Sequence, residues 1–303
     1  MKDRKIVVYV ALGFVISSLF LAFYFFFKKP IKINTPFLDQ ERKAIVFKDV
    51  KYSGEKRGIV DWEIKSKVTR KFIDKPVVEM EDIDGMYKPK PDVTVFFKGT
   101  KGSMDTEAEK GTVENVDIIY KGSYTLKSRF MDFDFKKGIT STTAPVDIKG
   151  AKLTLRGVGL TANTNEETVR IEKDVTGYIE TEKGKYRFES DSFIYFLKDS
   201  TYILENRVVM KGEEMNLLCD KLIIFSKGDE VEKIDAKGKV RLISKGTIAK
   251  SEKAVYHFKE DRIVLTDRPK ILKDNVEMEG ESIVYSLSSG KFFINKPKMR
   301  MER

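Results

Sequence analysis

The stretch AKSEKAVYHFKEDRIVLTDRPKI, residues 249–271, decides the fold of this 303-residue chain. It predicts a strand, a turn and a second strand, because Ala254, Tyr256 and Phe258 alternate with other residues ahead of a charged turn. A second apolar run follows the turn, and Pro269 limits further pairing. Alone this is an ordinary β-hairpin, and its importance comes from its repetition.

Similar units recur through the C-terminal half of the chain. Each has a small residue, an acid, a spacer, apolar residues, a turn and a second apolar run, at a spacing of roughly thirty residues that is typical of repeat architectures. The small residue and the acid are Ser190–Asp191, Cys219–Asp220, Ser251–Glu252 and Gly280–Glu281. A weaker continuation adds Ser128 and Gly157. This column favours stacked hairpins over a generic all-β domain with evenly spaced hairpins.

The part of the chain after residue 27 shows no helical periodicity of useful length, so an all-β fold is expected. Stacked antiparallel hairpins would form two sheets over an apolar interior, with alternation carried through each small residue and acid. Lys221 and Lys253 interrupt that register and suggest bulges. The predicted interior residues, which would contact aliphatic chains if the interior is an open groove, are Trp62, Ile64, Leu126, Leu155, Phe188, Ile194, Phe196, Leu217, Ile223, Phe225, Val255, Met278 and Val284. A closed, dry core is the alternative that the pattern leaves open.

Residues 6–27 form an uncharged run that matches the thickness of a bilayer core. Tyr9 and Tyr24 near its ends suit the membrane interface. This predicts an uncleaved transmembrane helix after a cytoplasmic head, residues 1–5, in preference to a signal peptide, whose apolar region is shorter and ends at a small-residue cleavage site. The helix is a tether, or it also contacts other helices through Gly13 and Ser17, and both readings stay open.

Composition narrows the classes of function. The net charge of +10 suits an anionic membrane or glycolipid, and no nucleic-acid motif accompanies it. The single cysteine, Cys219, excludes an intramolecular disulfide and is expected to be a buried small residue, and the single histidine, His257, has no companion for metal or triad chemistry. No metal site, cofactor or catalytic set is predicted, so a non-enzymatic protein is expected. The abundant carboxylates keep a glycosidase as a weaker alternative.

Several segments carry a family resemblance. The N-terminal run, followed by GIVDWEI (58–64), LKSRFMDFD (126–134), APVDI (144–148) and RGVGL (156–160), resembles LptC, the bitopic inner-membrane component of lipopolysaccharide transport. From about Gly184 the chain is instead similar to the LptA/OstA repeat, best at AKGKVRL (236–242) and VLTDRP (264–269). An ordinary LptC would end near Ile179, so the chain is longer than that family's pattern.

The resemblance implies an elongated, twisted β-jellyroll that binds lipopolysaccharide without catalysing a reaction. Such a protein receives the lipid from an inner-membrane ABC transporter and passes it along a periplasmic bridge of like folds toward the outer membrane, stacking edge to edge with its neighbours. The implied organisation is a linker at 28–42, an LptC-like periplasmic jellyroll at 43–180 and an LptA/OstA-like continuation at 181–303. The alternative is a membrane-anchored structural or adhesive β-repeat protein with a dry core.

Overall fold

The computed structural model of the chain is built from β-strands. It describes residues 37–39, 43–56, 59–90, 93–105, 107, 108, 110–120, 124–134, 137, 139–163, 166–196, 198–227 and 230–301. All the regular secondary structure within these ranges is β-strand, which confirms the expected all-β, antiparallel fold. No helix in the described ranges has the length and apolar character needed to cross a membrane. The predicted anchor at 6–27 lies outside them.

The chain divides into two compact units. Unit 1 comprises residues 1–151 with 158–169, and unit 2 comprises residues 152–157 with 170–303. Unit 1 contains β1 (Phe37–Asp39), β2 (Ala44–Lys56), β3 (Ile59–Phe72), β4 (Val77–Lys90), β5 (Val93–Asp105), β6 (Lys110–Tyr120), β7 (Tyr124–Asp134) and β8 (Ile139–Lys149). The strands β9 (Leu153–Asn163) and β10 (Thr168–Thr181) contribute residues to both units.

Unit 2 continues with shorter strands toward its end. They are β11 (Gly184–Ser190), β12 (Ser192–Phe196), β13 (Thr201–Lys211), β14 (Asn216–Lys227), β15 (Glu230–Ser244), β16 (Thr247–His257), β17 (Arg262–Thr266), β18 (Lys270–Lys273), β19 (Val276–Glu279), β20 (Ser282–Ser286), β21 (Phe292–Asn295) and β22 (Lys298–Met301).

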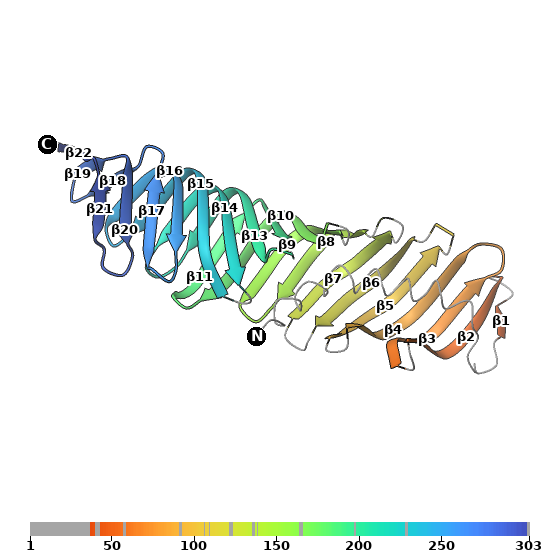
Figure 1. The fold of residues 1–303 in the computed structure, drawn as a ribbon. Coiled ribbons are helices and arrows are strands. Elements are labelled where there is room, and N and C mark those ends of the chain that lie inside the picture. Colours follow the sequence, from red (N-terminus) through yellow and green to blue (C-terminus); the bar gives the residue numbers. More distant parts are fainter. Residues whose placement is uncertain are drawn as a thin grey trace. The chain divides into compact units, whose positions relative to one another are not determined.

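Within each unit, strands pair mainly with their neighbours in sequence. In unit 1, β2 to β8 form one antiparallel series (Figure 1). In unit 2, β13 to β16 do the same, and β16 then pairs with β17 along one half and with β18 along the other. The break between β17 and β18 falls at Pro269, as expected, because proline cannot donate a ladder hydrogen bond.

Most long strands bend at a corner near their middle, and each unit therefore has two layers (Figure 1). In β14, Leu217 and Cys219 are buried before the corner, whereas Leu222 and Ile224 are buried after it. The pairing with β15 shifts between Leu218 and Lys221, which identifies a β-bulge. One extra residue at the corner moves the inward-facing positions from odd to even numbers.

The bulge changes which of the predicted interior residues face inward. Alternation carried straight through the acid placed Ile194, Phe196, Ile223, Phe225, Val255 and Val284 inside. Ile194 is buried at 8% exposure, but the assignment is wrong for the other five, which are only half-buried. Four of the six share one cross-strand row, which runs Ile194, Ile203, Ile223, Asp235, Val255, Val264, Val284 and Phe293. Phe196 and Phe225 lie in the next outer row, beside Lys233 and His257. Lys221 lies at this bulge, and the residues that follow it face the opposite way from the predicted register.

Small residues occupy the inner side of the corners, as the column predicts. Ser128, Ser190, Cys219 and Ser251 are all buried. The hydroxyl at four corners donates to the backbone oxygen two residues later, at 2.8 to 3.1 Å, and these residues are Ser66, Ser128, Ser190 and Ser251. Each hydroxyl therefore satisfies a carbonyl that the bulge leaves unpaired. Ser66 belongs to the column although the sequence pattern did not reveal it.

Candidate functional site

The candidate site is the apolar interior of each unit. Among the predicted interior residues, those buried at 9% exposure or less are Leu126, Leu155, Phe188, Ile194, Leu217 and Met278. The side chains of Trp62 and Ile64 lie outside the described part of the chain. Leu126 belongs to unit 1 and the other five to unit 2. The two arms of each strand thus supply a continuous apolar surface within each unit.

Inward residues that the sequence reasoning missed follow the corners of unit 2. The row Leu204, Leu222, Ala236, Ala254, Leu265 and Ile283 is buried, and so is the neighbouring row Ile224, Ile234, Tyr256, Ile263 and Tyr285. The signals that could have found them are Lys221 after Asp220 and Lys253 after Glu252, because a lysine in an apolar register marks a bulge.

Aromatic rings fill the start of the unit 2 interior. Phe188 and Phe193 stack with their centroids 6.5 Å apart, and Phe193 lies 5.9 Å from Tyr202. Tyr202 in turn stacks on Tyr195 at 4.6 Å. These rings present a flat apolar surface that is suited to alkyl chains.

A polar network closes one end of the unit 2 interior. Burial raises the pKa of Tyr186 to about 12 and also raises the pKa of Tyr256. The Tyr256 hydroxyl lies 3.5 Å from Asp261 Oδ1. Burial opposes ionisation of Asp261, but hydrogen bonds from the Ser288 backbone N–H at 2.8 Å and the Ser286 hydroxyl at 3.4 Å outweigh it and lower its pKa. The tyrosines therefore stay neutral and Asp261 stays ionised at neutral pH.

Cys219 is the buried small residue that the column predicted. Its side chain is inside the corner of β14, and burial raises the pKa of its thiol to about 12. A thiol held in this state is a poor nucleophile and a poor metal ligand. Within the described residues, no group of three or more potential ligands could hold a metal ion.

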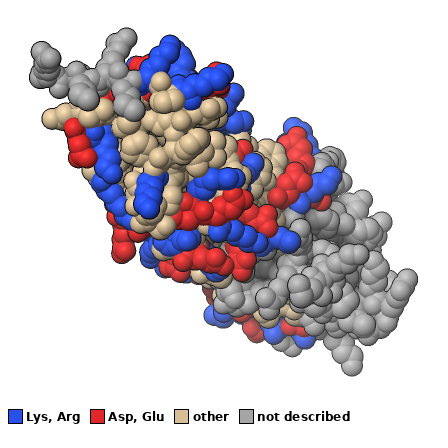
Figure 2. Space-filling model, turned by 60° about the vertical axis from the view of Figure 1, so that its left-hand side comes forward, with Lys and Arg blue, Asp and Glu red and all other residues tan. Residues whose placement is uncertain are grey.

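Charged residues occupy the outer side of the corners. In unit 2 the acid after the small residue pairs with a base across the corner: Asp191 with Arg207 at 2.5 Å, Asp220 with Lys239 at 3.7 Å, Glu252 with Arg268 at 3.1 Å and Glu281 with Lys296 at 2.6 Å. Each of these bases has a positive φ between 47° and 61°. Acidic and basic side chains are interleaved on the face drawn in Figure 2.

The corners of unit 1 carry the opposite arrangement. The residue after the small residue is basic, Lys67 after Ser66 and Arg129 after Ser128. The positive-φ residue opposite is Asp82 for Lys67 and Asn115 for Arg129. Asparagine and aspartate tolerate this left-handed conformation better than most residues.

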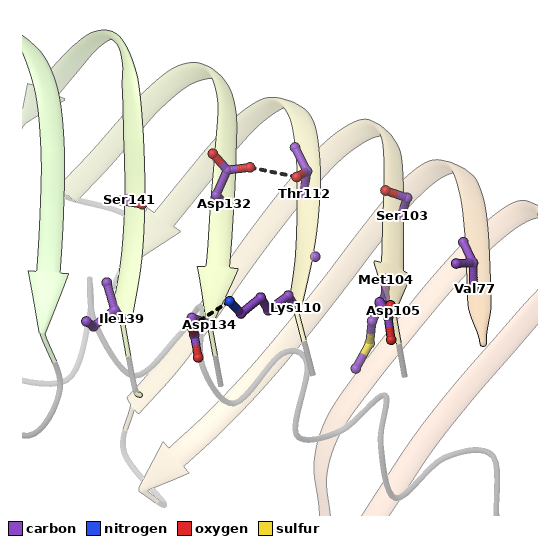
Figure 3. A pocket seen from close by; sticks show the side chains of 11 residues that line it. Val77, Ser103, Met104, Asp105, Lys110, Thr112, Asp132, Asp134, Ile139 and Ser141 are labelled. Carbon is purple, nitrogen blue, oxygen red and sulfur yellow. Dashed lines mark hydrogen bonds and ion pairs between the residues drawn. The ribbon is translucent and has the colours of Figure 1, made fainter. Parts of the chain in front are cut away.

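A pocket of about 480 Å³ lies on the outer face of unit 1, near the ends of the strands β4 to β8 (Figure 3). Its lining is mostly polar, with Ser103, Thr112, Asp132 and Ser141 in one cross-strand row. The Thr112 hydroxyl donates to Asp132 at 2.6 Å (Figure 3). This row of side chains suits polar groups.

Two family models match this chain. The family model described as "Lipopolysaccharide-assembly, LptC-related" matches residues 11–180. The model of the LptA and LptD N-terminal domain lipopolysaccharide transport proteins matches residues 187–291. Among solved structures the chain is similar to LptH, the LptA-homologous periplasmic component of the lipopolysaccharide transport device of Pseudomonas aeruginosa, with 17% identity over 41% of this chain and 99% of that one, at a TM-score of 0.38. No curated protein matches the chain.

Proposed function

The chain belongs to the LptC-related family of lipopolysaccharide-assembly proteins, with an LptA-like segment after the LptC region, and from this premise we propose how it acts in lipopolysaccharide transport. It receives lipopolysaccharide from an inner-membrane ABC transporter and passes it along a periplasmic jellyroll toward the outer membrane. The LptC and LptA families are non-enzymatic transport proteins, and the chain is no exception to this. The lipid moves without being chemically changed.

The observation that carries the proposal is the order of the two modules in one chain. The LptC-related match ends at residue 180, and the LptA-like match begins at residue 187. A single chain with both modules would take the place of two separate proteins in the transport path. The segment 43–180 takes the lipid at the transporter, and the segment 181–303 hands it to the next jellyroll by edge-to-edge stacking.

In this proposal the acyl chains bind the inner face of the sheets, and the sugars stay outside. Leu126, Leu155, Phe188, Leu217 and Met278 would contact the acyl chains, with the aromatic rings of unit 2 as their continuation. The basic net charge attracts an anionic glycolipid. Residues 6–27 anchor the chain in the inner membrane, and the bulk of the chain lies in the periplasm.

One observation favours a second candidate, a structural β-repeat protein with a dry core. Interior side chains such as Leu204, Leu222 and Tyr285 are completely buried by their neighbours. If the chain transports lipid, the acyl chains must replace these contacts, so the two layers must separate to admit them. A protein that never opens would keep the same core and bind no lipid.

Site-specific photocrosslinking distinguishes the two candidates. A photoreactive phenylalanine analogue replaces Phe193, which faces inward, and in a second variant it replaces Phe225, which lies in an outer row with Lys233 over its ring at 4.2 Å. Both variants keep an aromatic ring, so they form a matched pair. The full chain is illuminated in cells that are exporting lipopolysaccharide, and adducts are detected with an antibody against the glycolipid.

The transport proposal predicts a lipid adduct at position 193 and little adduct at position 225. The absence of an adduct at both positions, in a chain whose circular dichroism shows native β-structure, supports the dry core. Equal crosslinking at both positions would place the lipid on the outer face and contradict the interior as the binding surface.

A further inference from the structure

One corner charge of unit 1, that of Arg129, has no counterion among the residues that the structure describes. The strand register places Arg129 opposite Asn115, just as it places Lys67 opposite Asp82. Lys67 forms an ion pair with Asp82 at 3.0 Å. Asn115 carries no charge, and its amide donates to Thr100 Oγ1 at 2.9 Å.

Arg129 therefore stands apart from the other corner bases. Its guanidinium lies over the ring of Phe130, 6.0 Å from the centroid, and it forms no ion pair with any described residue. On the opposite side of β7, the neighbouring strand presents Ala144 and Pro145 near this level, neither of which carries a charge. The corner thus leaves one exposed guanidinium directed at solvent.

A pocket of about 650 Å³ lies beside this guanidinium. Its lining combines Arg129 with hydrogen-bonding groups and one aromatic ring, among them Asp117, Lys127, Phe130, Thr143 and Asp147. Lys127 neutralises Asp117 at 2.9 Å. The cationic end of the pocket is therefore formed by Arg129.

We propose that this pocket binds a phosphorylated sugar. The planar guanidinium of Arg129 matches two oxygens of a phosphoryl group, and a charge-assisted bond of this kind is stronger than a neutral one. The Thr143 hydroxyl, which also lines the pocket, adds a further donor.

The remaining lining favours a sugar phosphate over free phosphate. Asp117 and Asp147 offer carboxylate oxygens that can accept hydrogen bonds from the hydroxyls of a sugar ring. The half-buried ring of Phe130 offers a flat apolar surface to the carbon face of a sugar ring. The source of such a group is the phosphorylated headgroup of a glycolipid, and this assignment of the source rests on the proposed function.

The test measures the binding of three probes to the full chain by ³¹P or proton NMR titration. The probes are glucosamine 1-phosphate, glucosamine and inorganic phosphate. The wild-type chain should bind glucosamine 1-phosphate most tightly. Arg129→Gln should weaken that binding by roughly tenfold or more, as the loss of a hydrogen bond to a charged group implies.

Two further variants make the test specific. Asn115→Asp supplies Arg129 with the carboxylate that Asp82 supplies to Lys67, so it should weaken the phosphosugar as Arg129→Gln does. Lys67→Gln removes an equivalent corner base that is already paired, and it should leave the affinity unchanged. Undiminished binding by Arg129→Gln, or an equal affinity of the wild-type chain for inorganic phosphate, overturns the proposal.

A second arm separates this site from the proposed function. The full chain is offered intact and dephosphorylated lipopolysaccharide, and capture is read by crosslinking from position 193. If Arg129→Gln captures both lipids as the wild type does, the headgroup site fails and the transport function stands. If no lipid is captured but glucosamine 1-phosphate shows the expected variant pattern, the transport function fails and the sugar site stands.

Discussion

The corners of both units bend the strands, but their acidic and basic residues are arranged in opposite ways. In unit 2 an acid follows the small residue, and the base opposite it has positive φ, as in Asp191 and Arg207. In unit 1 a base follows the small residue, and Asp82 or Asn115 has positive φ. Aspartate and asparagine enter this conformation at lower cost than arginine or lysine.

The difference shows that the backbone of the corner, and not one particular charge pattern, is what the repeat preserves. Unit 2 uses two consecutive positive-φ residues at three corners, Asn206–Arg207, Gly238–Lys239 and Asp267–Arg268. Unit 1 uses single residues such as Asp82 and Asn115. Either solution bends the strand while keeping apolar side chains on the inner face of both arms.

The largest expected effect tests the corner of unit 2. Leu222 is completely buried, whereas its neighbour Ile223 is half-buried on the outer face. Leu222→Ala should reduce the free energy of unfolding by about 2–5 kcal/mol, as is usual for a buried leucine. Ile223→Ala should cost less than half as much. Urea unfolding of the full chain, followed by circular dichroism, measures both, and equal losses would contradict the one-residue shift at the corner.

Much of this fold was predictable from the sequence, and the exception is instructive. The hairpins, the all-β class and the buried column of small residues follow from alternation, turn residues and spacing. The inner or outer position of Ile223 and Val255 does not, because one inserted residue reverses every side chain after it. Local patterns on the two arms look alike, so only the paired register reveals the reversal.

The candidate site was predictable to the same extent. Phe188 and Leu217 precede their corners, and their inward position follows from simple alternation. The unpaired Arg129 could not be found in this way, because its significance depends on Asn115, which lies on another strand. A charge is recognised as unpaired only when all its spatial neighbours are known.

A smaller effect is expected where a glycine lies opposite an aromatic ring. A Cβ added at Gly85 would lie 1.8 Å from Cζ of Phe97, the cross-strand partner of this residue. Gly85→Val should therefore destabilise unit 1 by about 1–3 kcal/mol through overpacking. Adding Phe97→Ala should recover part of this loss, which urea unfolding of the double variant would measure.

Unit 2 supplies the matched control for this pair. A Cβ at Gly177 would meet the Phe188 ring at 2.5 Å and also the backbone oxygen of Thr154 at 2.4 Å. Truncation of the ring cannot relieve a clash with the backbone, so Phe188→Ala should not rescue Gly177→Val. Rescue in both units would show that the backbone near Thr154 can move to make room for the added side chain.

The smallest expected effect concerns the corner charges themselves. Arg207→Gln removes the partner of Asp191 and should lower the urea midpoint slightly at low salt, with no difference in 1 M salt, where charges are screened within about 3 Å. Glutamine is the suitable replacement, because asparagine or glycine would relieve the positive φ and mask the loss. Arg129→Gln should leave the midpoint unchanged at either salt concentration, because no described residue pairs with Arg129. A salt-dependent loss for Arg129→Gln equal to that for Arg207→Gln would reveal a counterion, and the sugar-phosphate pocket would then lose the free cation on which it depends.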